Sequence, residues 1–283
     1  MRRLVGFIAV VAFAVIYLSA LKQSDVEART LPKAVEGGGA SFAPFVKVLA
    51  LEFDGLAADM VFIEGLVFFG ETLERETIPR MQEWEWQWLF ETFKASAEID
   101  PYFYDPYYIA NAIFPWEGRL VRETNDLLVK GADKRDWDWT LLFYAGFNEF
   151  FFLHNSDTAA DLLMQAARRP DSSPIIPTLA ARLAYKGSRT ENAIRFLVEL
   201  LQGTTNPAER EQYETRLEAL KGIYVLEQTI KKFKVEFGRV PLRLQELVES
   251  GLIDAIPDDP YGGTFYIALN GSVGTTSDLR PIQ

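Results

Sequence analysis

Apolar and small residues recur at helical spacing through the middle of the chain, in four segments that fall into register about thirty-four residues apart. In each segment three core positions stand at spacings of four and three, which places them on one face of a helix. The core positions are Phe90, Lys94 and Ala97; Thr124, Leu128 and Gly131; Ala159, Leu163 and Ala166; and Ala193, Leu197 and Leu200. A period of this length is typical of helical hairpins that bury their apolar faces by stacking. The pattern therefore predicts a helical repeat domain over residues 44–207.

The same pattern predicts further elements after the repeats. Residues 208–237 carry apolar residues at helical intervals without interruption, and we interpret them as a long helix that caps the repeats. A short helix over 242–250 and two strands over 264–269 and 272–276 follow, and a two-residue turn at Asn270 and Gly271 joins the strands. The predicted fold is mostly α: an α-solenoid of helical hairpins, then a small C-terminal helix and β-hairpin over 208–283.

The N-terminus predicts a membrane segment. Arg2 and Arg3 precede eighteen residues without a charge, which at helical rise extend about 27 Å, close to the apolar thickness of a bilayer. The paired arginines favour a cytoplasmic N-terminus. We therefore predict an uncleaved transmembrane helix over 1–21, a flexible linker over 22–43, and a body in the periplasm, single-pass in a bacterial inner membrane. A cleaved signal peptide that releases the body into the periplasm is the alternative.

Aromatic residues gather at two places in the predicted repeats. Residues 100–108 hold five aromatic side chains, which we interpret as packing between hairpins, with a stacking platform for a sugar or a peptide as the alternative. Residues 146–152 are too apolar to face water on every side. We predict that their aromatic side chains serve both the core and the concave wall of the repeats.

Several residues follow the order in which one repeat family places small and apolar side chains. Ala159, Leu163, Ala166 and Pro170 give the second helix of such a repeat its small, apolar, small and proline positions, and Gly146 stands near the small position of the first helix. A looser copy consists of Ala181, Ala193, Leu197 and Pro207. On these residues, roughly half of the chain resembles the tetratricopeptide repeat (TPR) family.

The resemblance implies a scaffold that binds a partner without catalysis. In this family the first helix of each hairpin lines a concave groove. Carrying the register across places eight residues there: Ile109, Ile113, Trp116, Tyr144, Asn148, Arg182, Tyr185 and Lys186. Their mixture of aromatic, amide and basic groups suits a peptide or an acidic protein segment.

The C-terminal block carries a second resemblance, over residues 226–276. A long helix runs into a turn at Gly238 to Pro241, a short leucine-rich helix, a loop at Asp259 to Gly262, and a β-hairpin. This order is similar to the periplasmic end of type II secretion pseudopilins. The chain lacks the prepilin cleavage motif of that family. We interpret Asp258 and Asp259 as turn formers rather than calcium ligands.

The composition limits the partners and the reaction chemistry that can be predicted for the chain. A net charge of −11 is opposite to what phosphate neutralisation requires, so no nucleic-acid partner is predicted. The chain has no cysteine and one histidine, His154, which we interpret as a turn residue, so no metal, cofactor or catalytic residue is predicted. The enzyme alternative is a carbohydrate-active protein with paired carboxylates, for which Glu83, Glu85, Asp100 and Asp105 are the candidates.

These patterns lead to one main functional hypothesis. It is a non-catalytic, membrane-anchored TPR scaffold that binds another cell-envelope protein or peptide. The alternative is a structural or accessory component of a secretion or pilus-type assembly. Self-association is compatible with both.

Overall fold

The computed structural model describes residues 17, 47, 50–75, 80–268 and 270–280. Within them the chain forms ten α-helices, one π-helix and two short strands, so it is mostly helical, as predicted. The predicted transmembrane helix (1–21) and linker (22–43) lie, Tyr17 aside, outside the described residues. Among the residues that are described, no helix combines the length and apolar character needed to cross a bilayer.

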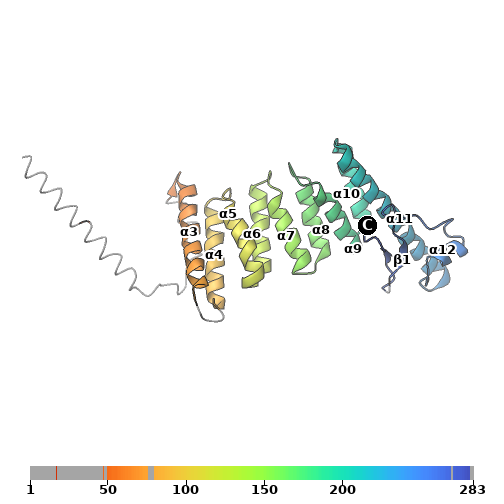
Figure 1. Ribbon diagram of the computed structural model, residues 1–283, viewed down its shortest axis with the longest axis horizontal. Coiled ribbons are helices and arrows are strands. Elements are labelled where there is room, and N and C mark those ends of the chain that lie inside the picture. Colours follow the sequence, from red (N-terminus) through yellow and green to blue (C-terminus); the bar gives the residue numbers. More distant parts are fainter. Residues whose placement is uncertain (1–16, 18–46, 48–49, 76–79, 269, 281–283) are drawn as a thin grey trace, which may run out of the picture.

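Nine of the helices stand side by side in chain order (Figure 1). They are α3 (Asp54–Leu73), α4 (Glu83–Ile99), α5 (Asp105–Ile113), α6 (Val121–Lys134), α7 (Thr140–Phe151), α8 (Ser156–Ala167), α9 (Ile175–Lys186), α10 (Thr190–Gly203) and α11 (Pro207–Phe237). Each packs on its neighbours in sequence, and α5 also contacts α7 while α9 also contacts α11. We call α3 to α11 the helical row. Its arrangement in hairpins, α3/α4 to α9/α10, is compatible with an α-solenoid.

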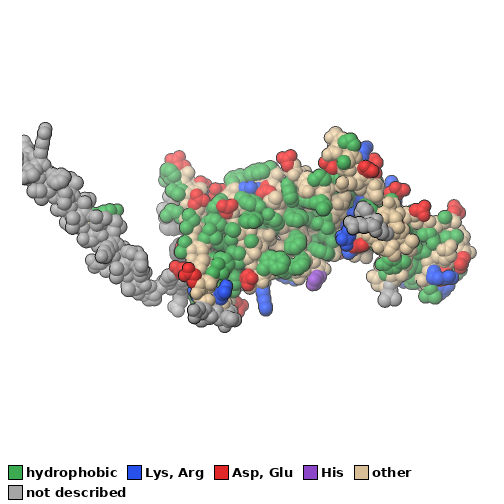
Figure 2. All heavy atoms as spheres, viewed as in Figure 1, with side chains coloured by type: hydrophobic (Ala, Val, Ile, Leu, Met, Phe, Trp, Pro, Cys, Tyr) green, Lys and Arg blue, Asp and Glu red, His purple; other side chains and the backbone are tan. Residues whose placement is uncertain are grey.

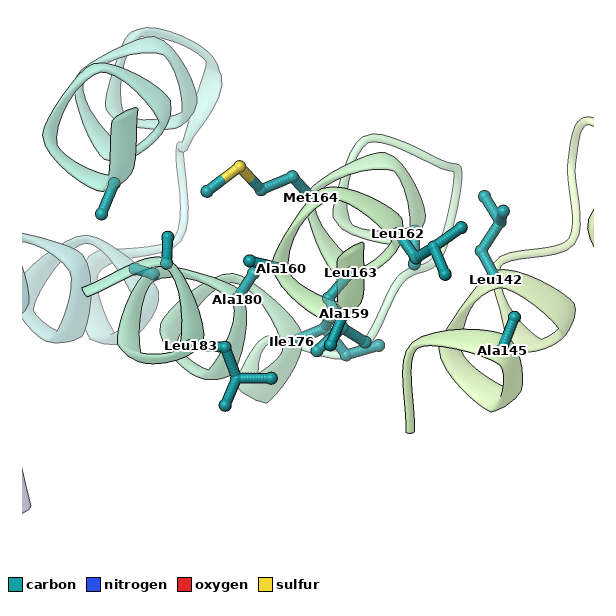
Figure 3. Packing of buried hydrophobic residues seen from close by; sticks show 14 of the residues in the cluster. Leu142, Ala145, Ala159, Ala160, Leu162, Leu163, Met164, Ile176, Ala180 and Leu183 are labelled. Carbon is teal, nitrogen blue, oxygen red and sulfur yellow. The ribbon is translucent and has the colours of Figure 1, made fainter. Parts of the chain in front are cut away.

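The core of the row follows the predicted register. Of the predicted core positions, only Lys94 and Leu200 are partly exposed, and the others are buried. Figure 3 shows α8 between α7 and α9, with Leu162 facing Leu142 on one side and Ala160 facing Ala180 on the other. A helix in such a row contacts a neighbour on each side, which explains why its apolar stripe is wide.

Small residues let the helices of a hairpin approach closely. At Gly146 of α7, a Cβ atom would lie 3.0 Å from Cγ of Leu163 and 3.3 Å from the carbonyl oxygen of Ala159. Distances of this kind are tighter than ordinary van der Waals contact, so a larger residue would push α7 and α8 apart. Gly146 and Ala159 thus meet at a helix crossing, despite the spacing that separates them in sequence.

The C-terminal block packs against α11. It contains α12 (Gln245–Glu249) and an antiparallel hairpin of β1 (Phe265–Ile267) and β2 (Val273–Thr275). The ring of Phe265 lies against Gly222 of α11, where a Cβ atom would come within 3.2 Å of it. This contact joins the hairpin to the row.

The predicted two-residue turn of this hairpin is wrong. The amide of Ala268 donates to the carbonyl of Ser272 at 2.8 Å, so three positions, 269–271, separate the paired strands. Gly271 donates to the carbonyl of Ala268 and has a φ of +81°, a conformation that glycine adopts without strain. This is the three-residue hairpin loop in which a residue with positive φ follows a tight turn.

Asp259 is a turn residue, as predicted, and it also holds the end of β2. Its Oδ1 accepts a hydrogen bond from the amide of Tyr261 at 2.9 Å, and its Oδ2 accepts from the hydroxyls of Ser277 at 2.6 Å and Thr275. The side chain is buried, and these donors satisfy its carboxylate. His154 lies in the turn between α7 and α8 with a φ of 53°.

Candidate partner-binding surface

Aromatic side chains of two successive first helices form a surface of two groups of contacting rings, and α7 contributes to both groups. We call it the aromatic surface, and its members are Tyr104, Tyr108, Trp116, Phe143, Tyr144, Phe147, Phe151 and Phe152. They come from α5 and the residue before it, from α7 and the residue after it, and from the π-helix η2 (Phe114–Gly118) that continues α5. Each ring lies within 6.4 Å of another member, measured between ring centroids. On the face drawn in Figure 2, hydrophobic side chains spread over the middle of the row.

The sequence of α7 produces this surface because the helix is apolar on two sides. Leu141, Leu142 and Ala145 are buried in the row. Residues 143, 147 and 151 are phenylalanines four positions apart, so they share the opposite face. The rings of Phe147 and Phe151 are parallel within 10°, with centroids 5.4 Å apart. An exposed face of this composition is unusual for a helix that meets only water.

Trp116 extends the surface from α7 to the neighbouring hairpin. Its indole packs edge-on against Phe152, at 4.7 Å between centroids, and lies 5.4 Å from Phe151. The π-helix η2 carries it, and Arg119, with a φ of 57°, ends that turn. Wide turns of this kind often occur at functional sites. Trp116 is 54% exposed, the largest exposed fraction in the aromatic surface.

Three tyrosines add hydroxyl groups to the aromatic surface. The hydroxyls of Tyr104 and Tyr144 lie 3.2 Å apart, and the ring of Tyr104 stacks on Tyr108. Burial, and then the hydrogen bond with Tyr104, raise the pKa of Tyr144 well above its usual value. The hydroxyl therefore stays protonated and neutral. It can donate or accept a hydrogen bond toward a bound segment.

A buried amide network lies beneath this surface. The Nδ2 of Asn148 donates to Oδ1 of Asn111 and to Oδ1 of Asn125, both at 2.9 Å, and Asn125 donates to Glu149 at 2.9 Å. These residues join α5, α6 and α7. Asn148 is 1% exposed, so its amide holds helices together and does not face a partner. Periodicity placed Asn148 on the groove wall, one residue away from the exposed Phe147.

The other predicted groove residues of the middle hairpins lie in different environments. Trp116 and Tyr144 belong to the aromatic surface. Ile109 is half-buried against the core, and Ile113 is also half-buried. The eight predicted groove residues did not include the phenylalanines of α7, but the prediction for the aromatic side chains over 146–152 included Phe147, Phe151 and Phe152.

The three predicted groove residues of α9 contact the chain's own C-terminal block. Arg182 forms an ion pair with Asp278, and Lys186 approaches the same carboxylate at 3.4 Å. The hydroxyl of Tyr185 donates to the carbonyl oxygen of Val273 at 2.7 Å, and burial raises the pKa of Tyr185 to about 12. These side chains already have partners within the chain.

Two cavities lie elsewhere in the described chain, and no residue of the aromatic surface lines them. One, of about 280 Å³, lies between α9, α11 and the β-hairpin and is lined by Tyr185, Glu227 and Tyr266. The other, of about 430 Å³, lies between the second helices α4 and α6 and is lined by Phe90, Leu127 and charged residues of both signs.

Three of the four candidate carboxylates of the enzyme alternative fall at opposite ends of α4, and the fourth, Asp105, lies in the first turn of α5. Glu83 and Glu85 lie in its first turn, and Asp100 follows its last residue. At helical rise, Glu85 and Asp100 are about 22 Å apart along the axis, more than twice the separation of paired glycosidase carboxylates. Glu85 is buried and accepts from Arg75 at 2.6 Å.

Comparisons with known proteins give no relative. No protein-family model, no curated protein and no solved structure matches the chain.

Proposed function

We propose that this protein is a non-catalytic scaffold of TPR-like hairpins that binds a segment of another cell-envelope protein on the aromatic surface. The observation that carries the proposal is the exposure of that surface. Tyr108, Trp116, Phe147 and Phe151 are 39–54% exposed although they are large and apolar and lie on adjacent first helices. An apolar face of this kind is typical of a protein interaction site.

The chemistry of the surface favours a protein segment as the ligand. Tryptophan and tyrosine are the residues that most often dominate binding energy at interfaces, since they bury a large rigid area and keep a polar group for orientation. The tyrosine hydroxyls of α5 and α7 supply such groups. The aromatic side chains are already packed against each other, so little side-chain entropy is lost on binding.

The envelope location rests on the N-terminal prediction. A transmembrane helix over 1–21 with a cytoplasmic N-terminus places the helical row in the periplasm, and residues 22–43 act as its tether. The partner is then a periplasmic protein or the periplasmic part of a membrane protein. An accessory role in a secretion assembly differs from this proposal in the identity of the partner.

Site-specific photo-crosslinking in native membranes tests the proposal. A photoreactive phenylalanine analogue replaces Phe147 in one variant and Val235 in a matched control, because Val235 is 88% exposed on α11, away from the aromatic surface. We expect one defined adduct from position 147 and none of the same mass from position 235. The additional substitutions Trp116→Ser and Phe151→Ser should abolish the adduct. An adduct of equal yield at both positions, or none at 147, would overturn the proposal.

A further inference from the structure

The first helix of the row, α3, is apolar on two opposite sides. Its inner side packs on α4: Phe62 contacts Phe93 with ring centroids 5.2 Å apart, and Phe68 contacts Trp88 at 4.6 Å. On the outer side Leu56, Met60, Ile63 and Val67 are 55–66% exposed. We call these four residues the outer seam. No described element covers it.

The spacing of the outer seam is that of a helix-pairing interface. Its residues follow one another at intervals of four, three and four, and Phe53, which is 61% exposed, extends the pattern by three. Apolar residues at alternating intervals of three and four form a narrow stripe that packs against one other helix. A helix that meets only solvent does not require such a stripe, and the terminal hairpin of a repeat array normally has a polar outer face.

The charged residues beside the outer seam indicate which kind of partner helix would bind there. Asp59 and Glu64 are the charged residues that flank the seam, beside the apolar Ala57 and Leu66, and α3 contains neither lysine nor arginine. In a parallel pair with a second copy, Asp59 of one helix would face Glu64 of the other, which is unfavourable. A helix with lysine or arginine beside its apolar stripe would instead form ion pairs there.

The described residue upstream of α3 lies on the other side of it. Lys47 donates through Nζ to the carbonyl oxygen of Glu98, at the C-terminal end of α4, at 3.2 Å. It also lines the cavity between α4 and α6 with Phe90 and Lys94. Because α4 packs on the inner side of α3, Lys47 lies away from the outer seam.

From the spacing and the acidic flanks we infer that the outer seam binds an amphipathic helix of another protein, with apolar residues at intervals of three and four and basic residues beside them. The site is on α3, whereas the aromatic surface is on α5 and α7. It therefore does not depend on the proposed function and can fail or hold independently of it.

Binding of two designed peptides to the purified full chain tests the inference. Both are helices of about three heptads with leucine at the seam positions, and they differ only in carrying lysine or glutamate at the flanking positions. We expect fluorescence anisotropy to show binding of the lysine peptide and at least about tenfold weaker binding of the glutamate peptide, with a difference that shrinks as salt is added.

Substitutions within the full chain localise the binding. Met60→Ser with Ile63→Ser should weaken binding of the lysine peptide about tenfold or more, and circular dichroism should stay unchanged because both side chains are mostly exposed. The matched control is Val225→Ser with Val235→Ser on α11, where both side chains are also exposed. Equal binding by parent and seam variant, or no binding by the parent, would overturn the inference. A dimer of the chain alone that the seam variant dissociates would also overturn it, since the occupant would then be a second copy.

Discussion

At its C-terminal end the last helix of the row, α11, packs against α12 and the β-hairpin, whereas at its N-terminal end α3 leaves Leu56, Met60 and Ile63 exposed. Both ends face the same physical problem, because a hairpin at the end of a row has only one neighbour to cover its apolar side. At the C-terminal end, residues of the same chain cover this apolar side. At the other end no described part of the chain does so.

The same difference exists along the first helices. On α9, Arg182, Tyr185 and Lys186 are held by the C-terminal block, while on α7 the phenylalanines face outward. The first helix α9 is covered by the C-terminal block and leaves few side chains for a partner. The two proposed binding surfaces lie on the exposed sides of the first helices α3, α5 and α7. Matched substitutions at the covered end and at the open end test this difference.

The largest effect is expected from a phenylalanine at each end. Phe265→Ala should lower the free energy of unfolding by about 3–5 kcal/mol, because Phe265 is buried against Gly222 of α11. Phe53→Ala, at a side chain that is 61% exposed, should change it by no more than about 0.5 kcal/mol. Urea unfolding followed by circular dichroism measures both. Similar losses at the two positions would mean that the ends are equally covered.

The next largest effect concerns the interior beneath the open aromatic surface. Asn148→Ala should lower the free energy of unfolding by about 1–3 kcal/mol, because the side-chain oxygens of the buried Asn125 and the half-buried Asn111 lose their donor. The same urea experiment measures it. Asn192→Ala is the control, since its amide accepts one exposed bond from Arg195 at 3.3 Å, and it should stay within about 0.5 kcal/mol of the parent. A loss in the control as large as that of Asn148→Ala would refute a structural role for the network.

A smaller effect is expected where the C-terminal block meets α9. Tyr185→Phe removes the donor to the carbonyl of Val273 and should lower the free energy of unfolding by about 1–2 kcal/mol. Tyr108→Phe, on the aromatic surface, should be nearly neutral because that side chain is exposed. Thermal unfolding of the two variants checks the difference. If Tyr108→Phe were the more damaging change, the assignment of covered and open helices would be reversed.

The sequence predicted the elements of the fold well because periodicity reports burial directly. Ala159, Leu163 and Ala166 repeat at helical spacing and are buried, and the helix predicted over 208–237 is α11. The hairpin loop was predicted one residue too short, since the preference of Asn270 and Gly271 for tight turns does not fix how the strands pair.

The candidate site was harder to predict, because partners within the chain cannot be read from spacing. Asn148 has the spacing of a groove residue, yet two asparagines of other helices hold it inside. Tyr185 and Asp278 are almost a hundred residues apart in sequence, and only folding brings them together beside the same cavity. The exposed seam of α3 has the helical spacing and apolar character of a buried face, so only the structure distinguishes the two.

The smallest effect is a pH dependence at the covered end. Burial between α11 and α9 raises the pKa of Glu227 above its usual value, although a hydrogen bond from Thr190 opposes the shift. The folded chain therefore favours protonated Glu227. The stability that this group contributes is complete below its unfolded pKa and is lost as pH rises through the higher folded pKa. Glu227→Gln removes the charge and should raise the melting temperature at neutral pH, with a difference that disappears near about pH 4. The exposed control Glu236→Gln should show no such trend. A lower melting temperature for Glu227→Gln at neutral pH would mean that Thr190 and Lys231 stabilise the carboxylate more than burial disfavours it.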